Sequence, residues 1–104
     1  MSTTPLRDVP ALVSSREPFE GNSMSAQHVK AHPKGYDVGY TGHLPKAEEG
    51  RYQDDLRAAG KLYVVYSYAT PIAWGPLDGP LYVPDVRYSV TTSKHQGIVR
   101  RARV

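Results

Sequence analysis

The segment "TTSKHQ", residues 91–96, gathers the side chains of this chain that are best suited to chemistry. Ser93 and His95 are the residue types of a hydrolase nucleophile and its base, although that chemistry also needs an orienting acid and an oxyanion hole. Lys94, together with the N–H groups at a helix start, would instead bind an anion. The spacing of Ser93 and Gln96 also matches a capping box, which needs no ligand. We favour capping, keep an anion site as the alternative and expect no catalytic residue.

Two other groups of residues have spacings that occur in active sites. His28 and His32 are four residues apart, as two metal ligands on a helix would be. Pro33 and the glycines nearby disfavour a helix, so we expect no metal site. The carboxylate pairs at 48–49 and 54–55 alternate with basic residues, which is typical of a solvated charged face. No phosphate-binding glycine-rich loop or dinucleotide motif is present, so we also expect no cofactor.

The stretch "YVVYSYATPIAW" concentrates aromatic residues in a chain with eight tyrosines, one phenylalanine and one tryptophan. Tyrosine offers a large contact area with a polar tip and is enriched at protein interfaces. In a chain this poor in other large apolar residues, tyrosine must also fill the core. We expect Tyr66 and Tyr88 to be inside, and Tyr63 or Tyr68, together with Trp74, to be more exposed. The predicted partner-binding residues are Tyr63, Tyr68, Trp74, Tyr82 and Arg87.

Length and composition limit the class of protein. The chain has 104 residues and no cysteine, so we expect one small domain without disulfides, thiolate catalysis or cysteine-ligated zinc. It has no run of about 18 apolar residues, which a membrane helix would need. Its first residues lack the pattern of a signal peptide. We therefore expect a cytoplasmic protein without membrane contact.

Basic residues gather near the C-terminal end, in "RRARV" and just before it, and the formal net charge is +3. Such a cluster can contact phosphate groups, although basic ends are also common solvated termini. The predicted anion or nucleic-acid contacts are Lys94, His95, Arg100, Arg101 and Arg103.

The first part of the chain shows little periodicity. Residues 1–18 hold three prolines among Ser, Thr and charged residues, which predicts an extended or disordered arm. Phe19 is expected to anchor this arm to a single domain over residues 19–104. The glycine-rich stretch 28–45 predicts a loop or short extended pieces.

Residues 46–59 predict a helix. Tyr52, Leu56 and Ala59 recur on one face, which indicates a narrow stripe packed on a sheet. Acidic residues lie in the first turn, near the positive end of the helix dipole, and Gly60 is a natural C-terminal stop.

From Lys61 the period changes to two, with apolar or aromatic residues on both faces, which predicts a central strand. Pro71 bends or ends it, "IAW" restarts a strand, and the Asp-Gly turn of "GPLDGP" leads to the strands "LYV" and "DVRYSVTT". These segments predict an antiparallel meander of three or four strands. The capping box then begins a short helix over residues 94–102. The predicted fold class is α+β, with one helix before the meander and one after it.

Two motifs, "YSYxTPIAW" and "YSVTTSxHQ", resemble those of a small uncharacterised domain family of actinobacterial phages and plasmids. The resemblance covers residues 19–100. It implies an accessory protein of a mobile element that acts inside a bacterial host, and it implies no catalytic residue. Where that family has a second tryptophan, this chain has "GPLY", so the resemblance implies no shared aromatic surface there.

We therefore predict a non-enzymatic accessory protein that binds a host protein or ribonucleoprotein in the cytoplasm of the bacterial host. The tyrosine-rich sheet and the basic C-terminus would form the contact, and the arm would become ordered on the partner. Direct binding of single-stranded nucleic acid is the alternative. A minor structural protein of the virion is a further alternative, and a hydrolase that uses His95 with Ser93 is the weakest.

Overall fold

The computed structural model describes residues 4–21, 23–30, 44–68, 70–84 and 90–101. The 3-10 helix η1 (Leu6–Asp8) and helix α1 (Val9–Ser14) precede the strands β1 (Phe19–Glu20) and β2 (Met24–Lys30). Helix α2 (Lys46–Ala59) is followed by β3 (Lys61–Ser67), β4 (Thr70–Gly75) and helix α3 (Val90–Arg101). Within these ranges, no helix is both long enough and apolar enough to cross a membrane.

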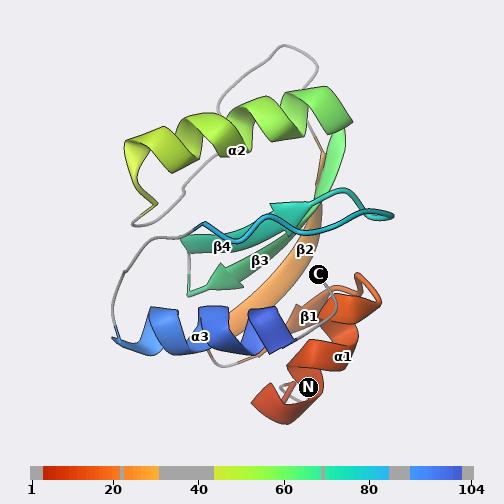
Figure 1. The fold of residues 1–104 in the computed structure, drawn as a ribbon. Coiled ribbons are helices and arrows are strands. Elements are labelled where there is room, and N and C mark those ends of the chain that lie inside the picture. Colours follow the sequence, from red (N-terminus) through yellow and green to blue (C-terminus); the bar gives the residue numbers. More distant parts are fainter. Residues whose placement is uncertain (1–3, 22, 31–43, 69, 85–89, 102–104) are drawn as a thin grey trace.

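The strands form one antiparallel sheet in the order β1-β2-β3-β4 (Figure 1). The position of β3 between β2 and β4 confirms the central strand predicted from its two apolar faces. The α+β class is confirmed as well, with α2 before β3 and a short C-terminal helix. The members of the sheet differ from the prediction, because β1 and β2 come from the chain before α2. Most of the glycine-rich stretch predicted as a loop, residues 31–43, lies outside the described ranges.

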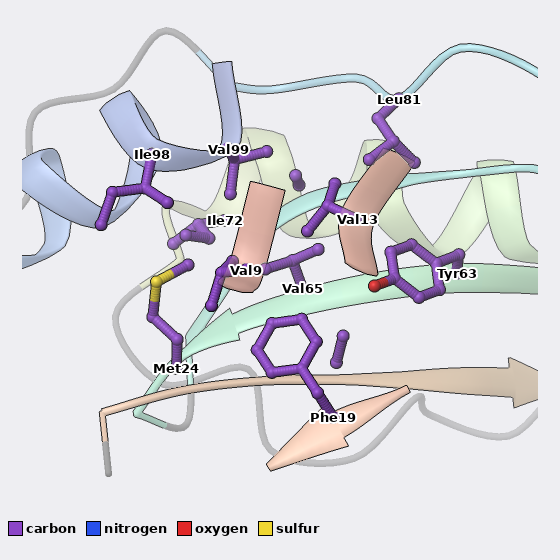
Figure 2. Packing of buried hydrophobic residues seen from close by; sticks show 12 residues of the cluster. Val9, Val13, Phe19, Met24, Tyr63, Val65, Ile72, Leu81, Ile98 and Val99 are labelled. Carbon is purple, nitrogen blue, oxygen red and sulfur yellow. The ribbon is translucent and has the colours of Figure 1, made fainter. Parts of the chain in front are cut away.

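Separate cores lie on the two faces of the sheet. One lies between the sheet and the helices α1 and α3, and the other lies between the sheet and α2 (Figure 1). Tyr63 and Val65 of β3 belong to the first core, whereas Leu62 and Val64 belong to the second. Figure 2 shows side chains from α1, α3 and the strands meeting in the first core. The two-residue period of β3 thus lets one strand support both layers.

Helix α2 confirms the helix predicted over residues 46–59. Gly60 takes the left-handed conformation, with a φ of 76°, and its N–H donates to Leu56 O at 2.8 Å. This is the predicted stop, since a glycine adopts that conformation without a Cβ penalty. Tyr52 and Leu56 are buried as predicted, but Ala59 is exposed and borders a groove instead.

The N-terminal segment is not the extended arm that its composition predicts. Residues 6–14 are helical, and Val9 and Val13 are 1% and 0% exposed in the first core. Their four-residue spacing puts both on one face of α1, and Pro10 is tolerated because it lies in the first turn. Burial of this face, rather than local propensity, stabilises so short a helix. Phe19 joins the same core, in agreement with its predicted anchoring role.

The chain after β4 pairs less than predicted. In the described part of the chain, residues 81–83 contact β4 through a bridge between Trp74 and Tyr82. Pro80 and Pro84 flank this segment. Because proline lacks the N–H that a strand ladder needs, the predicted strand is reduced to one bridge.

The last predicted strand and the capping box are wrong where the structure describes them. Residues 85–89 lie outside the described ranges, and α3 already begins at Val90. Ser93 is therefore inside the helix, where it cannot be the N-cap. Gln96 donates its Nε2 hydrogen to Pro84 O at 3.0 Å instead. Packing of α3 on the sheet overrides the strand tendency of its β-branched first residues.

Candidate functional site

The fold divides the aromatic residues that were predicted to form one contact surface. Tyr68 is 64% exposed, whereas Tyr63 and Trp74 are both 0% exposed. Tyr82 is half-buried, and Arg87 lies outside the described ranges. The prediction of an exposed Trp74 is therefore wrong. The prediction that Tyr63 or Tyr68 is exposed is confirmed for Tyr68.

Trp74 is buried because α2 covers its face of the sheet. Its ring lies 5.1 Å from the ring of Tyr52, and its Nε1–H donates to Asp55 Oδ2 at 2.9 Å. Tyr82 donates its hydroxyl to the carboxylate of Glu48, with oxygen distances of 2.6 and 2.9 Å, and this hydrogen bond raises the pKa of Tyr82. The carboxylates of Glu48 and Asp55, which were predicted to be solvated, thus attach α2 to Trp74 of β4 and to Tyr82, which is bridged to β4. Their seven-residue spacing, with Tyr52 between them, is the sequence signal for this role.

Tyr63 is buried on the opposite face of the sheet. Its hydroxyl donates to Glu17 O at 2.7 Å, and burial raises its pKa. The ring of His28 lies 5.8 Å from that of Tyr63, and its Nε2 lies 2.9 Å from Arg16 O. His28 is therefore in a strand, not on the helix that a metal-binding pair would need, and His32 lies outside the described ranges.

Of the two tyrosines predicted to be inside, Tyr66 is half-buried on the α2 side and Tyr88 lies outside the described ranges. The side chains of Tyr66 and Tyr52 are hydrogen-bonded, and burial raises the pKa of both phenols. Among the described residues, Tyr68 is therefore the exposed large apolar side chain.

Tyr68 lies in a strained turn between β3 and β4. Its φ is 56°, a left-handed conformation that costs a residue with a Cβ roughly 1–2 kcal/mol. Its N–H donates to Ser23 O at 2.7 Å, which ties the turn to the residue before β2. The left-handed backbone also interrupts the alternation of β3. As a result, the ring lies near α3, 6.1 Å from the ring of His95, and not on the α2 side as its parity predicts.

His95 of α3 is buried between two serine hydroxyl groups. It is 2% exposed, its Nδ1 lies 2.7 Å from Ser67 Oγ, and its Nε2 lies 3.1 Å from Ser23 Oγ. Since a hydroxyl group can donate or accept, a neutral imidazole is satisfied in either tautomer. Burial lowers the pKa of His95, and the charge of Lys94 adds to this effect. We call these three residues the Ser23–His95–Ser67 bridge. They join α3 to the residue before β2 and to the last residue of β3.

The predicted anion contacts on α3 are only partly available. Lys94 and Arg100 are exposed, but His95 is buried against the sheet and does not present its ring to an anion as predicted. Arg101 ends α3, and Arg103 lies outside the described ranges. The exposed Lys94 directly precedes His95, whose ring lies 6.1 Å from that of the exposed Tyr68.

The family model DUF8033, a family of unknown function, matches residues 9–99. The chain belongs to this family. No curated protein and no solved structure matches it. The DUF8033 match begins at Val9, the first residue of α1, so α1 is part of the family domain. The Ser23–His95–Ser67 bridge and Tyr68 also lie within the matched range.

This DUF8033 chain also has a groove of about 530 Å³ beside α2. Ala59 and Pro80 contribute to its walls. At one end, the guanidinium of Arg51 lies 3.7 Å from the ring centre of Tyr82, and its Nε lies 3.5 Å from Asp55 Oδ2. Arg51 and Asp55 already bind each other and the aromatic rings of Tyr82 and Trp74, so their main role is to attach α2 to the rest of the protein.

The contact between Ser23 and His95 has the atoms of a nucleophile and a base, but the described residues around it do not form the rest of a hydrolase site. A hydroxyl group, that of Ser67, stands where an orienting carboxylate would be. The backbone N–H groups of Gly21 and Tyr68 donate to carbonyl oxygens, so neither is available for an oxyanion. The geometry favours a structural bridge that holds the Tyr68 turn.

Proposed function

We propose that this DUF8033 protein is a non-enzymatic binding protein whose contact surface is centred on Tyr68. The observation that carries the proposal is that Tyr68 is 64% exposed although its backbone has a φ of 56°. Strained conformations persist only where the surrounding structure enforces them, and they concentrate at functional sites. An exposed tyrosine provides a large contact area with two side-chain torsions to immobilise, which suits recognition.

The backbone of Tyr68 is held in place within the protein itself. Its N–H is bonded to Ser23 O, and the preceding residue, Ser67, contacts His95 Nδ1. Ser67 is 1% exposed, so this second contact is shielded from water. Pre-organisation of this kind reduces the entropic cost of association.

The surroundings of Tyr68 favour a partner that presents both apolar and anionic groups. Lys94 is exposed beside His95, and Arg100 is exposed on the same helix. The net charge of +3 also favours encounter with an acidic partner. We therefore propose a host protein or ribonucleoprotein as the partner. The motif resemblance to proteins of phages and plasmids supports an accessory role in the cytoplasm of a bacterial host.

A pull-down from bacterial lysate, with and without nuclease, tests this function. Tyr68→Asn removes the ring but tolerates a left-handed backbone, and Tyr68→Phe keeps the ring. Gln27→Ala, at an exposed position of β2, is the control. We expect one protein to be retained by the wild type, Tyr68→Phe and Gln27→Ala, and lost with Tyr68→Asn. Equal retention by Tyr68→Asn, or no partner under either condition, would reject the proposal.

Binding of single-stranded nucleic acid is the second candidate, because an exposed ring can stack on a base and the exposed cations of α3, Lys94 and Arg100, can neutralise phosphates. Stacking contributes about 1–3 kcal/mol per base, so Tyr68→Asn should weaken binding about 5- to 150-fold. Lys94→Gln should reduce the salt dependence of the affinity. Fluorescence anisotropy with labelled oligonucleotides at low and high salt measures both effects. Affinity that does not change with salt would remove this candidate.

A further inference from the structure

Three elements of the protein meet at one buried imidazole. His95 comes from α3, Ser67 ends β3, and Ser23 precedes β2. Ser67 is followed directly by Tyr68, whose N–H is bonded to Ser23 O. The bridge that attaches α3 to the sheet is therefore also the support of the exposed turn.

This environment favours a neutral ring over a charged one, because the two hydroxyl groups can satisfy its nitrogens but cannot neutralise a charge. The neutral imidazole donates from one nitrogen and accepts at the other, which two hydroxyl groups can satisfy. The imidazolium donates from both nitrogens, so the hydroxyl that donated to the ring has to turn its hydrogen away. The added charge would also be confined at a site where His95 is 2% exposed, and an unpaired buried charge is strongly disfavoured.

The groups around the ring do not compensate such a charge. On α3, the ammonium group of Lys94 repels a proton on His95 and adds to the effect of burial on its pKa. The β3–β4 turn contributes the phenol of Tyr68, and the two serines contribute uncharged hydroxyl groups. Helix α1, which shares the core with α3, contributes apolar side chains to it. Among the described residues, the charge that acts on His95 is thus a repulsive one.

We propose that the Ser23–His95–Ser67 bridge is a proton-controlled lock, which closes α3 onto the sheet at neutral pH and releases α3 and the Tyr68 turn when His95 is protonated. Release brings the imidazolium into water, which solvates its charge. The core on the α2 side does not include α3, so it can remain intact when α3 leaves the other face. The lock does not depend on the binding function proposed above.

Hydrogen exchange of the backbone amides, followed by NMR on the full chain at about pH 7.5 and about pH 5, tests the lock. Protection factors, which correct for the intrinsic pH dependence of exchange, are compared for α3, α2 and β3. On acidification, the protection of α3 should fall by up to about tenfold for each unit by which burial lowers the pKa of His95. The protection of α2 and β3 should remain.

Three variants make the test specific. In His95→Gln, which can bind hydroxyl groups but cannot gain a proton, the protection of α3 should be independent of pH. In Lys94→Gln, which changes an exposed position, the acid response should become smaller because the repulsion is gone. His28→Gln replaces an exposed histidine of β2 and should leave the response unchanged. An unchanged α3 in the acidified wild type, or equal losses in α2 and β3, would overturn the lock. So would a full acid response in His95→Gln.

Discussion

Tyr68 and Trp74 lie on either side of the β3–β4 turn, and the backbone gives them opposite environments. The left-handed φ of 56° turns Tyr68 out of the strand alternation toward solvent. Trp74 lies opposite Val64 of β3, on the face of the sheet that α2 covers. Both residue types are enriched in strands and at interfaces, so side-chain identity cannot distinguish the two positions. The decisive quantity is a backbone torsion that sequence periodicity does not report.

If the Tyr68 backbone stores strain, removing the side chain should stabilise the protein. Tyr68→Asn replaces an exposed ring with a residue that tolerates the left-handed region, so we expect a gain of up to about 1 kcal/mol in the free energy of unfolding. Tyr66→Asn, at a half-buried position of β3 without a positive φ, should instead lose stability because it removes packing against the core on the α2 side. Urea denaturation followed by Trp74 fluorescence measures both. A clear loss with Tyr68→Asn would mean that the ring contributes packing that outweighs the strain.

The hydrogen bond from Trp74 to Asp55 should contribute measurably to stability. Trp74→Phe removes the indole N–H, leaves one carboxylate oxygen without its donor and creates a small cavity, which together should cost about 2–4 kcal/mol. Asp55→Asn keeps an acceptor oxygen and should cost less than about 1.5 kcal/mol. Because Trp74 is the single tryptophan, circular dichroism must follow the unfolding. Equal losses in the free energy of unfolding for the two substitutions would indicate that the ion pair of Asp55 with Arg51 matters more than its hydrogen bond with Trp74.

Helix α2 and strand β3 were predictable because their signals are local. A proline, an acidic first turn and Gly60 define α2, and a two-residue period with two apolar faces defines β3. Helix α1 was not predictable in this way, since a helix of six residues depends on the burial of Val9 and Val13. The start of α3 was misplaced for the same reason. Its β-branched first turn favours a strand until packing on the sheet decides otherwise.

The glycine inside α2 and the glycine that ends this helix should respond to alanine in opposite directions. Gly60 has a positive φ, and a Cβ there would meet no atom within 4 Å, so the cost of Gly60→Ala is that of the backbone conformation, about 1 kcal/mol. Gly50 lies inside the helix, and a Cβ there also meets nothing within 4 Å. Gly50→Ala should therefore stabilise by about 1 kcal/mol. Thermal unfolding of the pair gives the comparison, and a shift of the same sign for both would contradict this assignment of the helix end.

The arrangement of the candidate site depends on the whole molecule. His95 contacts Ser67 and Ser23, which are 28 and 72 positions away in the sequence. The sequence indicated His95 and the exposure of either Tyr63 or Tyr68, but it paired His95 with the neighbouring Ser93. Contacts of such separation follow from the order of the strands and the face on which α3 lies, and neither is encoded in a local motif. The residue types of the site were therefore predictable, and their partners were not.

The buried titratable groups should confine the stability of the molecule to a window of pH. The pKa of His95 is lowered in the folded state, so below about pH 6.5 the unfolded chain binds a proton that the folded chain refuses, and stability falls as the pH falls. The pKa values of Tyr52, Tyr63 and Tyr66 are raised, so above about pH 10 the unfolded chain releases protons that the folded chain keeps, and stability falls as the pH rises. Each group contributes at most about 1.4 kcal/mol per pH unit.

Urea midpoints across this range should show a plateau between the two limits. Tyr63→Phe, which lacks the titrating hydroxyl, should reduce the alkaline slope and leave the acid slope intact; an unchanged alkaline slope would exclude Tyr63 as a source of the loss.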